Sequence, residues 1–386
     1  MHRYLDEVIH QDLLRKIILI SGPRQCGKTT LAKSLGEVFT YLNYDSQEDR
    51  QILLKKTWDP TQPLVIFDEL HKMAKWKQWL KGLYDTRIPF QPTVVTGSAR
   101  LDIFRRAGDS LAGRFFQFHL HPLDLEEIRL FWKAGSDLSD EAIFRRFWES
   151  GPFPDPFLNG DPAYYRRWRS AHLDIVLRQD VQDLSAVRDI QTMETLVALL
   201  RERVGSPISV LSLARDLQKD PNTIRRWLEL LESLYVLFKV TPYHRNVARS
   251  LLKEPKYYFY DFCQVSDDPA KFENIIAAAL LKKLQFIQDT QGYRMSLHYV
   301  RTRDGRELDF LVLKETQPFA LIEVKWGDSK PSPNFKTLAP FFEKDGQTIH
   351  KIQIVRTISQ TEVYPSGVQV VPIRWLFSQM GEQLIS

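Results

Sequence analysis

The feature that most constrains this 386-residue chain is a glycine-rich turn near its amino end. Residues 22–30 read Gly-Pro-Arg-Gln-Cys-Gly-Lys-Thr-Thr and lie between an apolar run at 17–20 and a helix-like stretch at 31–35. In such a turn, backbone N–H groups at the start of a helix converge on phosphate oxygens, where the helix dipole favours negative charge. The sequence therefore predicts a phosphate-binding loop between a strand and a helix.

The positions of this loop have expected roles in holding a nucleoside triphosphate with Mg²⁺. Lys28 is expected to reach the outer phosphates, and Thr29 to bind Mg²⁺ through its hydroxyl. Further nucleotide contacts are expected from Gly22, Gln25, Cys26, Gly27 and Thr30. The competing interpretation is a glycine-rich surface turn that carries an exposed lysine.

A second apolar run, residues 64–67, ends in two acids, Asp68 and Glu69. Ligands bind at the carboxyl ends of strands in α/β sheets, so both side chains are expected beside the loop. Asp68 is expected to hold Mg²⁺ through water, and Glu69 to orient and polarise the water that attacks the γ-phosphate. The alternative is an acidic cap of the following helix.

Two further polar positions complete the predicted ATPase site. A third strand-like run ends in hydroxyl side chains, and Thr96 or Ser98 is expected between the carboxylates and the phosphate, with a helix cap as the alternative. Arg114 is the candidate for offsetting negative charge in the transition state. Arg105 and Arg106 are alternatives, and a surface salt bridge is the competing interpretation for each.

The composition limits the classes of protein to which this chain can belong. Hydrophobic residues make up 43% of the chain and charged residues 26%, and no apolar run approaches the roughly twenty residues of a membrane span. The amino end shows no signal-peptide pattern, and the two cysteines, Cys26 and Cys263, lie far apart. We therefore expect a globular cytoplasmic protein without a membrane partner. The net charge of +5 permits a polyanionic partner but does not require one.

The middle of the chain reads as helical and winged-helix-like. Two helical patterns, 207–217 and 223–231, are joined by a tight turn and followed by a strand-like run at 235–240. Asn222, Thr223, Arg225 and Arg226 lie at the start of the second helix, where such a module contacts DNA. The alternative is a module that makes only protein contacts. The basic and aromatic stretch 164–169 fits either nucleic-acid binding or an ordinary amphipathic helix with its arginines outward.

The last part of the chain predicts an α/β arrangement. The expected order is a helix near 271–286, strands at 298–303, 306–313 and 319–326, a helix near 334–343, and a strand at 351–355. This order resembles the core of the PD-(D/E)xK nuclease superfamily. The resemblance implies that Asp309 and Glu323 bind a divalent cation, that Lys325 activates water or steadies the developing charge, and that Glu273 is the acidic residue of the first helix. The alternative is a buried ion pair between Asp309 and Lys325 without catalysis.

Taken together, these motifs resemble the AAA-type ATPase core of a large prokaryotic family of ATP-binding proteins. The resemblance is carried by residues 22–25, 27–30, 68–69, 96–98, 111–114 and 121–123. In that family the core precedes a C-terminal domain of unknown function with a restriction-endonuclease-like fold. The resemblance covers essentially the whole chain and implies ATP and Mg²⁺ as cofactors, with a second divalent cation in the C-terminal domain.

The junction after the core departs from that family. The family has a Gly-Gly-Phe-Pro turn, whereas this chain has Gly151-Pro152-Phe153-Pro154. Pro152 fixes φ, so a stiffer hinge is expected. The predicted domains are an AAA-type P-loop ATPase at 1–150, a helical and winged-helix-like domain at 151–245, and a nuclease-like α/β domain at 246–386.

Two functions fit this reading. The first is an ATPase that couples nucleotide hydrolysis to a nucleic-acid transaction, with DNA as the expected partner and homo-oligomers as a further expectation. The second is a nucleotide-gated regulatory or partner-binding module whose nuclease-like domain cleaves nothing.

Overall fold

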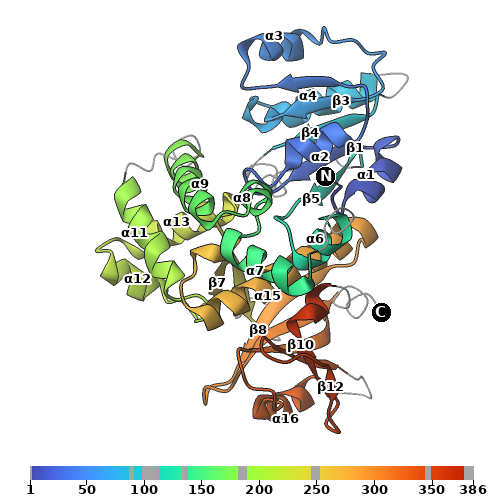
Figure 1. Cartoon of the computed structure of the whole chain (residues 1–386). Coiled ribbons are helices and arrows are strands. Elements are labelled where there is room, and N and C mark those ends of the chain that lie inside the picture. The colour runs from blue at the N-terminus through green and yellow to red at the C-terminus, as the bar shows by residue number, and fades with distance from the viewer. Residues whose placement is uncertain are drawn as a thin grey trace. The chain divides into compact units, whose positions relative to one another are not determined.

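The computed structural model describes residues 2–86, 91–97, 111, 113–132, 138–180, 189–244, 253–343 and 349–377 (Figure 1). The chain forms two compact units. The first contains Met1–Leu123 with the short segments Phe153–Asp155 and Ser233–Tyr235. The second contains Asp124–Pro152, Pro156–Glu232 and Val236–Ser386.

The first unit is built on a five-stranded parallel sheet in the order β2-β3-β4-β1-β5. Its strands are β1 (Ile17–Ser21), β2 (Thr40–Asn43), β3 (Val65–Asp68), β4 (Thr93–Thr96) and β5 (Phe115–His119). Its helices are α1 (Asp6–Leu13), α2 (Lys28–Ser34), α3 (Gln47–Lys55), the short η1 (Leu70–Lys72) and α4 (Trp76–Thr86). Every residue of β1, β3 and β4 is buried, as expected for central strands of a parallel sheet with both faces covered.

The second unit begins with a helical region. It contains α6 (Leu125–Trp132), α7 (Asp140–Ser150), α8 (Pro154–Asn159), α9 (Pro162–Asp174), the π-helical η4 (Ile175–Asp180), α11 (Ile190–Arg201), α12 (Val210–Asp216) and α13 (Pro221–Ser233). Only the first two residues of α8 and the last residue of α13 belong to the first unit. The predicted helix, turn, helix and strand order around α12 and α13 is confirmed, and the Ser209 side chain caps α12 by accepting from the N–H of Ser212. In α9, Tyr165 and Trp168 are buried while Arg166 and Arg167 are exposed, which is the pattern of an ordinary amphipathic helix.

The rest of the second unit is a mixed sheet of eight strands in the order β12-β13-β11-β10-β9-β8-β6-β7. The strands are β6 (Leu237–Pro242), β7 (Lys256–Phe259), β8 (Met295–Arg301), β9 (Glu307–Lys314), β10 (Gln317–Lys325), β11 (His350–Val355), β12 (Glu362–Val363) and β13 (Val368–Pro372). The other elements are η5 (Phe262–Gln264), α15 (Asp268–Gln291), α16 (Pro333–Leu338), η6 (Ala339–Phe341) and η7 (Ile373–Phe377). The long helix α15 packs against β7, β8 and β10 (Figure 1).

The compact units divide the chain differently from the sequence prediction. The predicted boundaries are at residues 150 and 245, whereas the units separate at Leu123 and group the middle helices with the C-terminal sheet. The physical reason is β6, which pairs with both β7 and β8 and so ties the winged-helix-like region into that sheet. Among the described helices, none combines the length and the apolar character needed to cross a bilayer.

Candidate functional site

The predicted phosphate-binding loop follows β1 and leads directly into α2. Gln25 and Gly27 both have positive φ, 62° and 100°, so successive N–H groups turn toward one side of the loop. A Cβ on Gly22 would lie 2.1 Å from the carbonyl oxygen of Leu120, which only glycine avoids. The strand, loop and helix of the sequence prediction are therefore confirmed.

Lys28 lies over its own loop. Its Nζ donates to the carbonyl oxygens of Gly22, at 3.0 Å, and Pro23, at 2.7 Å. The side chain is buried and so held at the loop rather than in solvent. The alternative of an exposed surface lysine does not describe this residue.

Arg3 donates hydrogen bonds to backbone carbonyls in and near the loop, and the sequence does not predict this role. Its Nη1 donates to the carbonyl of Cys26 at 2.6 Å, and its Nη2 to the carbonyl of His121 at 2.7 Å. The residue is only 4% exposed. No sequence signal marks Arg3, because its partners are carbonyl groups that every residue carries.

Hydroxyl groups from three neighbouring segments donate hydrogen bonds to Asp68. Thr29 Oγ1 donates to Asp68 Oδ2 at 2.9 Å, Tyr41 OH donates to the same oxygen at 2.7 Å, and Thr96 Oγ1 donates to Oδ1. The strand order explains this convergence, since β4 lies between β3 and β1 and brings Thr96 between the acid and the loop. Burial and the neighbouring Asp68 raise the pKa of Tyr41 above its usual range.

At Glu69, directly after Asp68, the backbone leaves the extended conformation of the strand. Its φ of 54° is in the left-handed region, so its side chain leaves the direction that a continued strand would give. Burial raises the pKa of Glu69; Lys28 and Lys72 oppose that shift, and Asp68 and Asp45 add to it. Glu69 Oε2 lies 3.7 Å from Lys72 Nζ and 3.6 Å from His71 Nε2.

Arg114 is not brought to the loop of its own chain. It immediately precedes β5 and so lies at the amino edge of the sheet, whereas the loop follows the carboxyl end of β1. Its guanidinium donates to both oxygens of Asp85, at 2.7 and 3.1 Å. The surface salt bridge describes this residue, and a catalytic role within one chain lacks the geometry it needs. Ser98, Arg105 and Arg106 lie outside the described residues.

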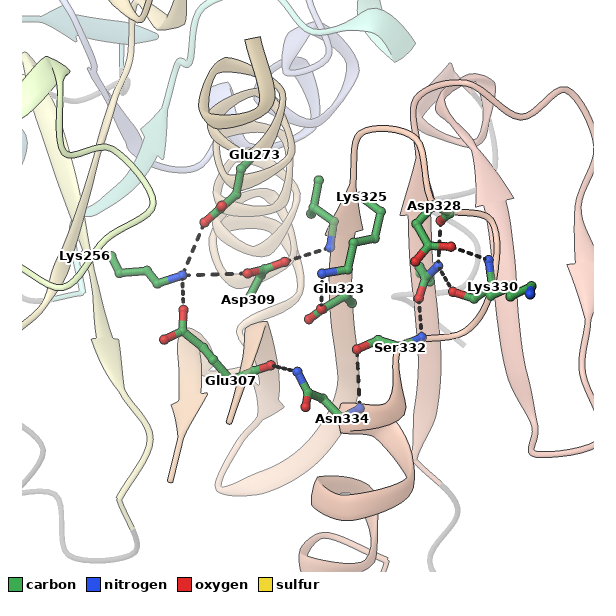
Figure 2. A network of polar contacts seen from close by, with 12 residues as sticks. Lys256, Glu273, Glu307, Asp309, Glu323, Lys325, Asp328, Lys330, Ser332 and Asn334 are labelled. Carbon is green, nitrogen blue, oxygen red and sulfur yellow. Dashed lines mark hydrogen bonds and ion pairs between the residues drawn. The ribbon is translucent and has the colours of Figure 1, made fainter. Parts of the chain in front are cut away.

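A second group of acids lies in the C-terminal sheet (Figure 2). The register that pairs Leu321 with Leu311 and Ile322 with Phe310 continues to bring Asp309 opposite Glu323. Glu323 is buried, its Oε1 lies 2.7 Å from Lys325 Nζ, and its Oε2 has no hydrogen-bond partner in the described parts of the chain. Burial and the nearby Asp309 raise the pKa of Glu323 to about 7, against the opposing effect of Lys325.

Glu273, on α15, belongs to the same region. Tyr258 OH donates to its Oε1 at 2.6 Å. Burial, together with the charge of Asp309, raises the pKa of Glu273 to about 7, and Lys256 opposes the shift. The structure thus gathers Glu273, Asp309 and Glu323 in one region, and their role as metal ligands stays a prediction.

Lys256 lies among these acids, although none of the sequence motifs includes it. Its Nζ is 2.6 Å from Glu307 Oε1, 3.3 Å from Glu273 Oε1 and 3.7 Å from Asp309 Oδ1. The predicted alternative, an ion pair between Asp309 and Lys325, is replaced by these contacts, because Asp309 pairs with Lys256 and Lys325 pairs with Glu323. A lysine at the start of the aromatic strand 257–260 was the available signal.

No metal centre is evident in the described segments. Among their His, Cys, Asp and Glu side chains, no group of three or more is arranged to hold a metal ion. The predicted second divalent cation therefore stays a prediction.

The start of α13 offers a basic surface. Arg225 and Arg226 are exposed, and Arg225 Nη1 donates to Asn222 Oδ1 at 2.7 Å. Ile224, Trp227, Leu228 and Leu231 form the buried face of the same helix. The arginines are thus free of the core, although acidic Glu229 is also exposed on this helix.

Three family models match consecutive parts of the chain. Residues 14–129 match an AAA domain, residues 141–263 a domain of unknown function (DUF8612), and residues 270–376 another domain of unknown function (DUF4143). These matches do not describe the C-terminal part as a nuclease, so that resemblance stays a prediction.

Two bacterial proteins are similar in sequence to most of this chain. An uncharacterized protein of Haemophilus influenzae is 23% identical over 411 residues, which cover 97% of each chain. An uncharacterized protein of Mycobacterium tuberculosis is 26% identical over 324 residues, which cover 80% of this chain and 70% of the relative. Among solved structures, the Orc1 protein of Aeropyrum pernix in complex with DNA has 12% identity and a TM-score of 0.33, covering 72% of this chain and 92% of that chain. A TM-score of this size does not define a shared fold.

The family matches agree with the geometry of the loop and of the acids that follow β3. The chain is therefore an AAA-domain protein in which two domains of unknown function follow the AAA domain, and the AAA domain implies nucleotide binding, typically of Mg²⁺ with ATP.

Proposed function

We propose that this protein binds Mg²⁺ with ATP at the loop of residues 22–30 and hydrolyses the γ-phosphate. The observation that carries the proposal is the convergence of Thr29 and Thr96 on Asp68 beside the loop, with Glu69 next to it. Hydroxyl and carboxylate oxygens are the donors that Mg²⁺ prefers, so Thr29 and Asp68 fit this cation. When bound, Mg²⁺ neutralises charge on the phosphates.

The roles of the side chains follow from their positions. Lys28 exchanges its loop carbonyl partners for phosphate oxygens, which are stronger acceptors for an ammonium. Glu69 orients and deprotonates the attacking water, and its raised pKa makes it a stronger base than an ordinary exposed glutamate. Thr96 holds Asp68 in place. An arginine for the transition state has to come from elsewhere than Arg114 of the same chain, and a second copy of the chain is the source we propose.

The test separates binding from turnover. Titration calorimetry should show ATP binding by the wild type and by Glu69→Gln, but not by Lys28→Ala. Steady-state phosphate release should be lost in Glu69→Gln, by about 10²-fold or more, because general base catalysis is typically worth that much. Equal hydrolysis by wild type and Glu69→Gln would remove Glu69 from the mechanism, and unchanged ATP affinity in Lys28→Ala would remove the proposed site.

We further propose that nucleotide turnover serves a nucleic-acid transaction and that α13 contacts DNA. The support is the exposed pair Arg225 and Arg226 at the start of this helix, over a buried apolar face. Fluorescence anisotropy with a labelled duplex should give a weaker Kd for Arg225→Ala/Arg226→Ala, with the salt slope smaller by about two. Arg215→Ala with Lys219→Ala, on and just after α12, is the control of equal charge loss. An equal effect of both double variants would contradict docking through α13.

The second candidate is recognition without cleavage by the C-terminal unit. The observation that favours it is Lys256, whose ammonium lies among the acids that cleavage would need. Plasmid DNA incubated with Mg²⁺ or Mn²⁺ tests the catalytic roles predicted for Asp309, Glu323 and Lys325. Nicking that disappears in Asp309→Ala and Glu323→Ala would establish a nuclease, whereas no nicking in any nucleotide state supports recognition alone.

A further inference from the structure

Three carboxylates of the second unit converge on one buried ammonium (Figure 2). Glu273 comes from α15, and Glu307 and Asp309 come from β9. Lys256 Nζ lies 2.6 to 3.7 Å from an oxygen of each, and the lysine side chain is 1% exposed. The ring of Tyr299 closes another side, with Nζ 5.4 Å from its centroid. The ammonium thus occupies the point on which the three carboxylates converge.

Further contacts hold the three acids in place, and Tyr258 bonds to the same Glu273 oxygen that faces Lys256. Asp309 Oδ2 accepts from the backbone N–H of Val324 at 2.7 Å. Glu273 Oε1 accepts from Tyr258 OH, and Glu273 Oε2 packs so closely on Gly205 that a Cβ there would lie 2.8 Å away. Glu307 Oε2 lies 3.4 Å from Arg301 Nη1. A divalent cation needs several oxygen ligands at about 2.0 to 2.6 Å, and one oxygen of each acid already faces the ammonium of Lys256.

The neighbouring acid does not complete a metal site by itself. Glu323 keeps one buried oxygen without a hydrogen bond in the described residues, but its other oxygen pairs with Lys325. Asp309, the carboxylate opposite it, is already held by Lys256 and Val324. A cation placed between Asp309 and Glu323 would therefore meet one ammonium on each side.

We propose that the ammonium of Lys256 is the resident cation of the cluster formed by Glu273, Glu307 and Asp309, so that the native chain takes no divalent metal there. Removal of this one positive charge converts the cluster into a site for Mn²⁺ or Mg²⁺. The inference goes beyond the proposed ATPase, because it concerns the second unit and does not depend on the nucleotide loop.

The first test uses the intact chain without nucleotide and counts free Mn²⁺ by electron paramagnetic resonance. Wild type, Glu273→Gln and Asp309→Asn should give the same binding curve, because these acids serve the lysine and not the metal. A wild-type site that is lost in either variant would overturn the proposal. This comparison does not need any change at Lys256.

The second test removes the charge. Lys256→Met keeps the length of the side chain and should gain a Mn²⁺ site at least tenfold tighter than any site that wild type shows without nucleotide. The gain should vanish in Lys256→Met/Asp309→Asn and should not occur in Lys325→Met, the matched control, whose ammonium pairs with Glu323 instead. A folded Lys256→Met that gains no Mn²⁺ binding would refute the proposal. A gain of equal size in Lys325→Met would show that the effect is not specific to Lys256, and it would refute the proposal as well. Thermal melting with and without Mn²⁺ reports folding and binding together, since a metal that binds the folded state raises the Tm.

Discussion

Arg3 is bonded to the backbone of the nucleotide loop. Two charge-assisted hydrogen bonds run from its guanidinium to Cys26 and His121, and both acceptors are buried backbone carbonyls. Arg3→Met should weaken ATP binding by about tenfold, because losing a hydrogen bond to a charged group costs roughly 1.5 to 3 kcal/mol, part of which falls on the loop. Calorimetric titration measures the change. Tyr4→Phe is the control, since Tyr4 OH donates to the carbonyl of His119 and accepts from the N–H of His121, two residues beyond the loop of residues 22–30. An equal loss of affinity in both variants would contradict a specific role for Arg3.

Gly22 makes the closest backbone approach in the loop. Gly22→Ala should destabilise the first unit, because the new Cβ would lie 2.1 Å from the Leu120 carbonyl oxygen and one of the two segments has to shift. Gly82→Ala, within α4, is the matched control, because nothing lies within 4 Å of the new Cβ. The control should gain about 0.5 to 1 kcal/mol from lower chain entropy and better helix propensity. Urea denaturation compares the two, and stabilisation by both substitutions would disprove the close approach.

Single residues show which part of the site could be predicted from the sequence. Lys28, Thr29 and Asp68 follow from local patterns, because a loop between strand and helix and an acid after a buried strand are short-range features. Arg3, Tyr41 and Lys256 could not be predicted, since each acts on groups brought close only by the fold. The role predicted for Arg114 lacks the required geometry within one chain for the same reason. The sequence shows its charge but not the edge of the sheet at which it lies.

At the scale of elements, a buried ion pair joins α6 and α15. Lys282 Nζ lies 2.6 Å from Glu127 Oε2 and 3.0 Å from Asp124 Oδ2. Lys282→Met should lower the free energy of unfolding by about 3 to 5 kcal/mol, because it leaves buried carboxylates without their cation. Lys283→Met is the control, since Lys283 lies 3.6 Å from the more exposed Glu126 and should cost about 1 kcal/mol. Urea denaturation of the second unit measures both, and equal losses would count against the buried pair.

The junction between β6 and β8 should make stability depend on pH. Burial lowers the pKa of His298, whose ring nitrogens lie 3.1 Å from Thr241 Oγ1 and 3.2 Å from Ser296 Oγ. The folded state therefore favours the neutral ring, so its contribution is complete above the usual histidine pKa near 6.5 and falls as the pH drops through that value. We expect a larger loss of urea midpoint between pH 7.5 and pH 5 for wild type than for His298→Gln. The same loss in both proteins would exclude His298 as the cause.

The elements themselves divide into those with local signals and those without. The core strands of both sheets and the helix α15 were predicted within a few residues. Buried runs, hydrophobic periodicity and Asp267, which caps the start of α15, are local features of the sequence. The strands β2, β5, β12 and β13 were not predicted, and the pairing of β6 with the C-terminal sheet has no signal in the sequence. Its partner β8 lies more than fifty residues later in the chain, and pairing at such a separation leaves no local mark.

At the scale of the whole molecule, the segment 153–155 belongs to the unit that carries the nucleotide loop, although its neighbours on both sides belong to the other unit. Within the first unit, Pro154 Cγ would lie 4.0 Å from a Cβ on Gly27, so the segment rests against the start of α2. The sequence marked this stretch as a stiff hinge through Pro152 but gave no reason to connect it with the loop. A ligand that orders the loop should therefore order this segment as well, because packed neighbours share their freedom of motion.

Hydrogen exchange measured by mass spectrometry tests this connection. Saturating Mg²⁺ with ATP should slow exchange in peptides that cover residues 22–30 and 151–158, because binding stabilises the folded state of the unit that contains the site. A peptide from α9 should exchange at an unchanged rate, since α9 lies wholly in the second unit. Lys28→Ala should show none of these changes if they arise from the bound nucleotide. Protection of the loop without protection of residues 151–158 would mean that the segment contacts α2 but is not stabilised when the nucleotide binds. Equal protection of α9 would mean that the nucleotide acts on both units at once.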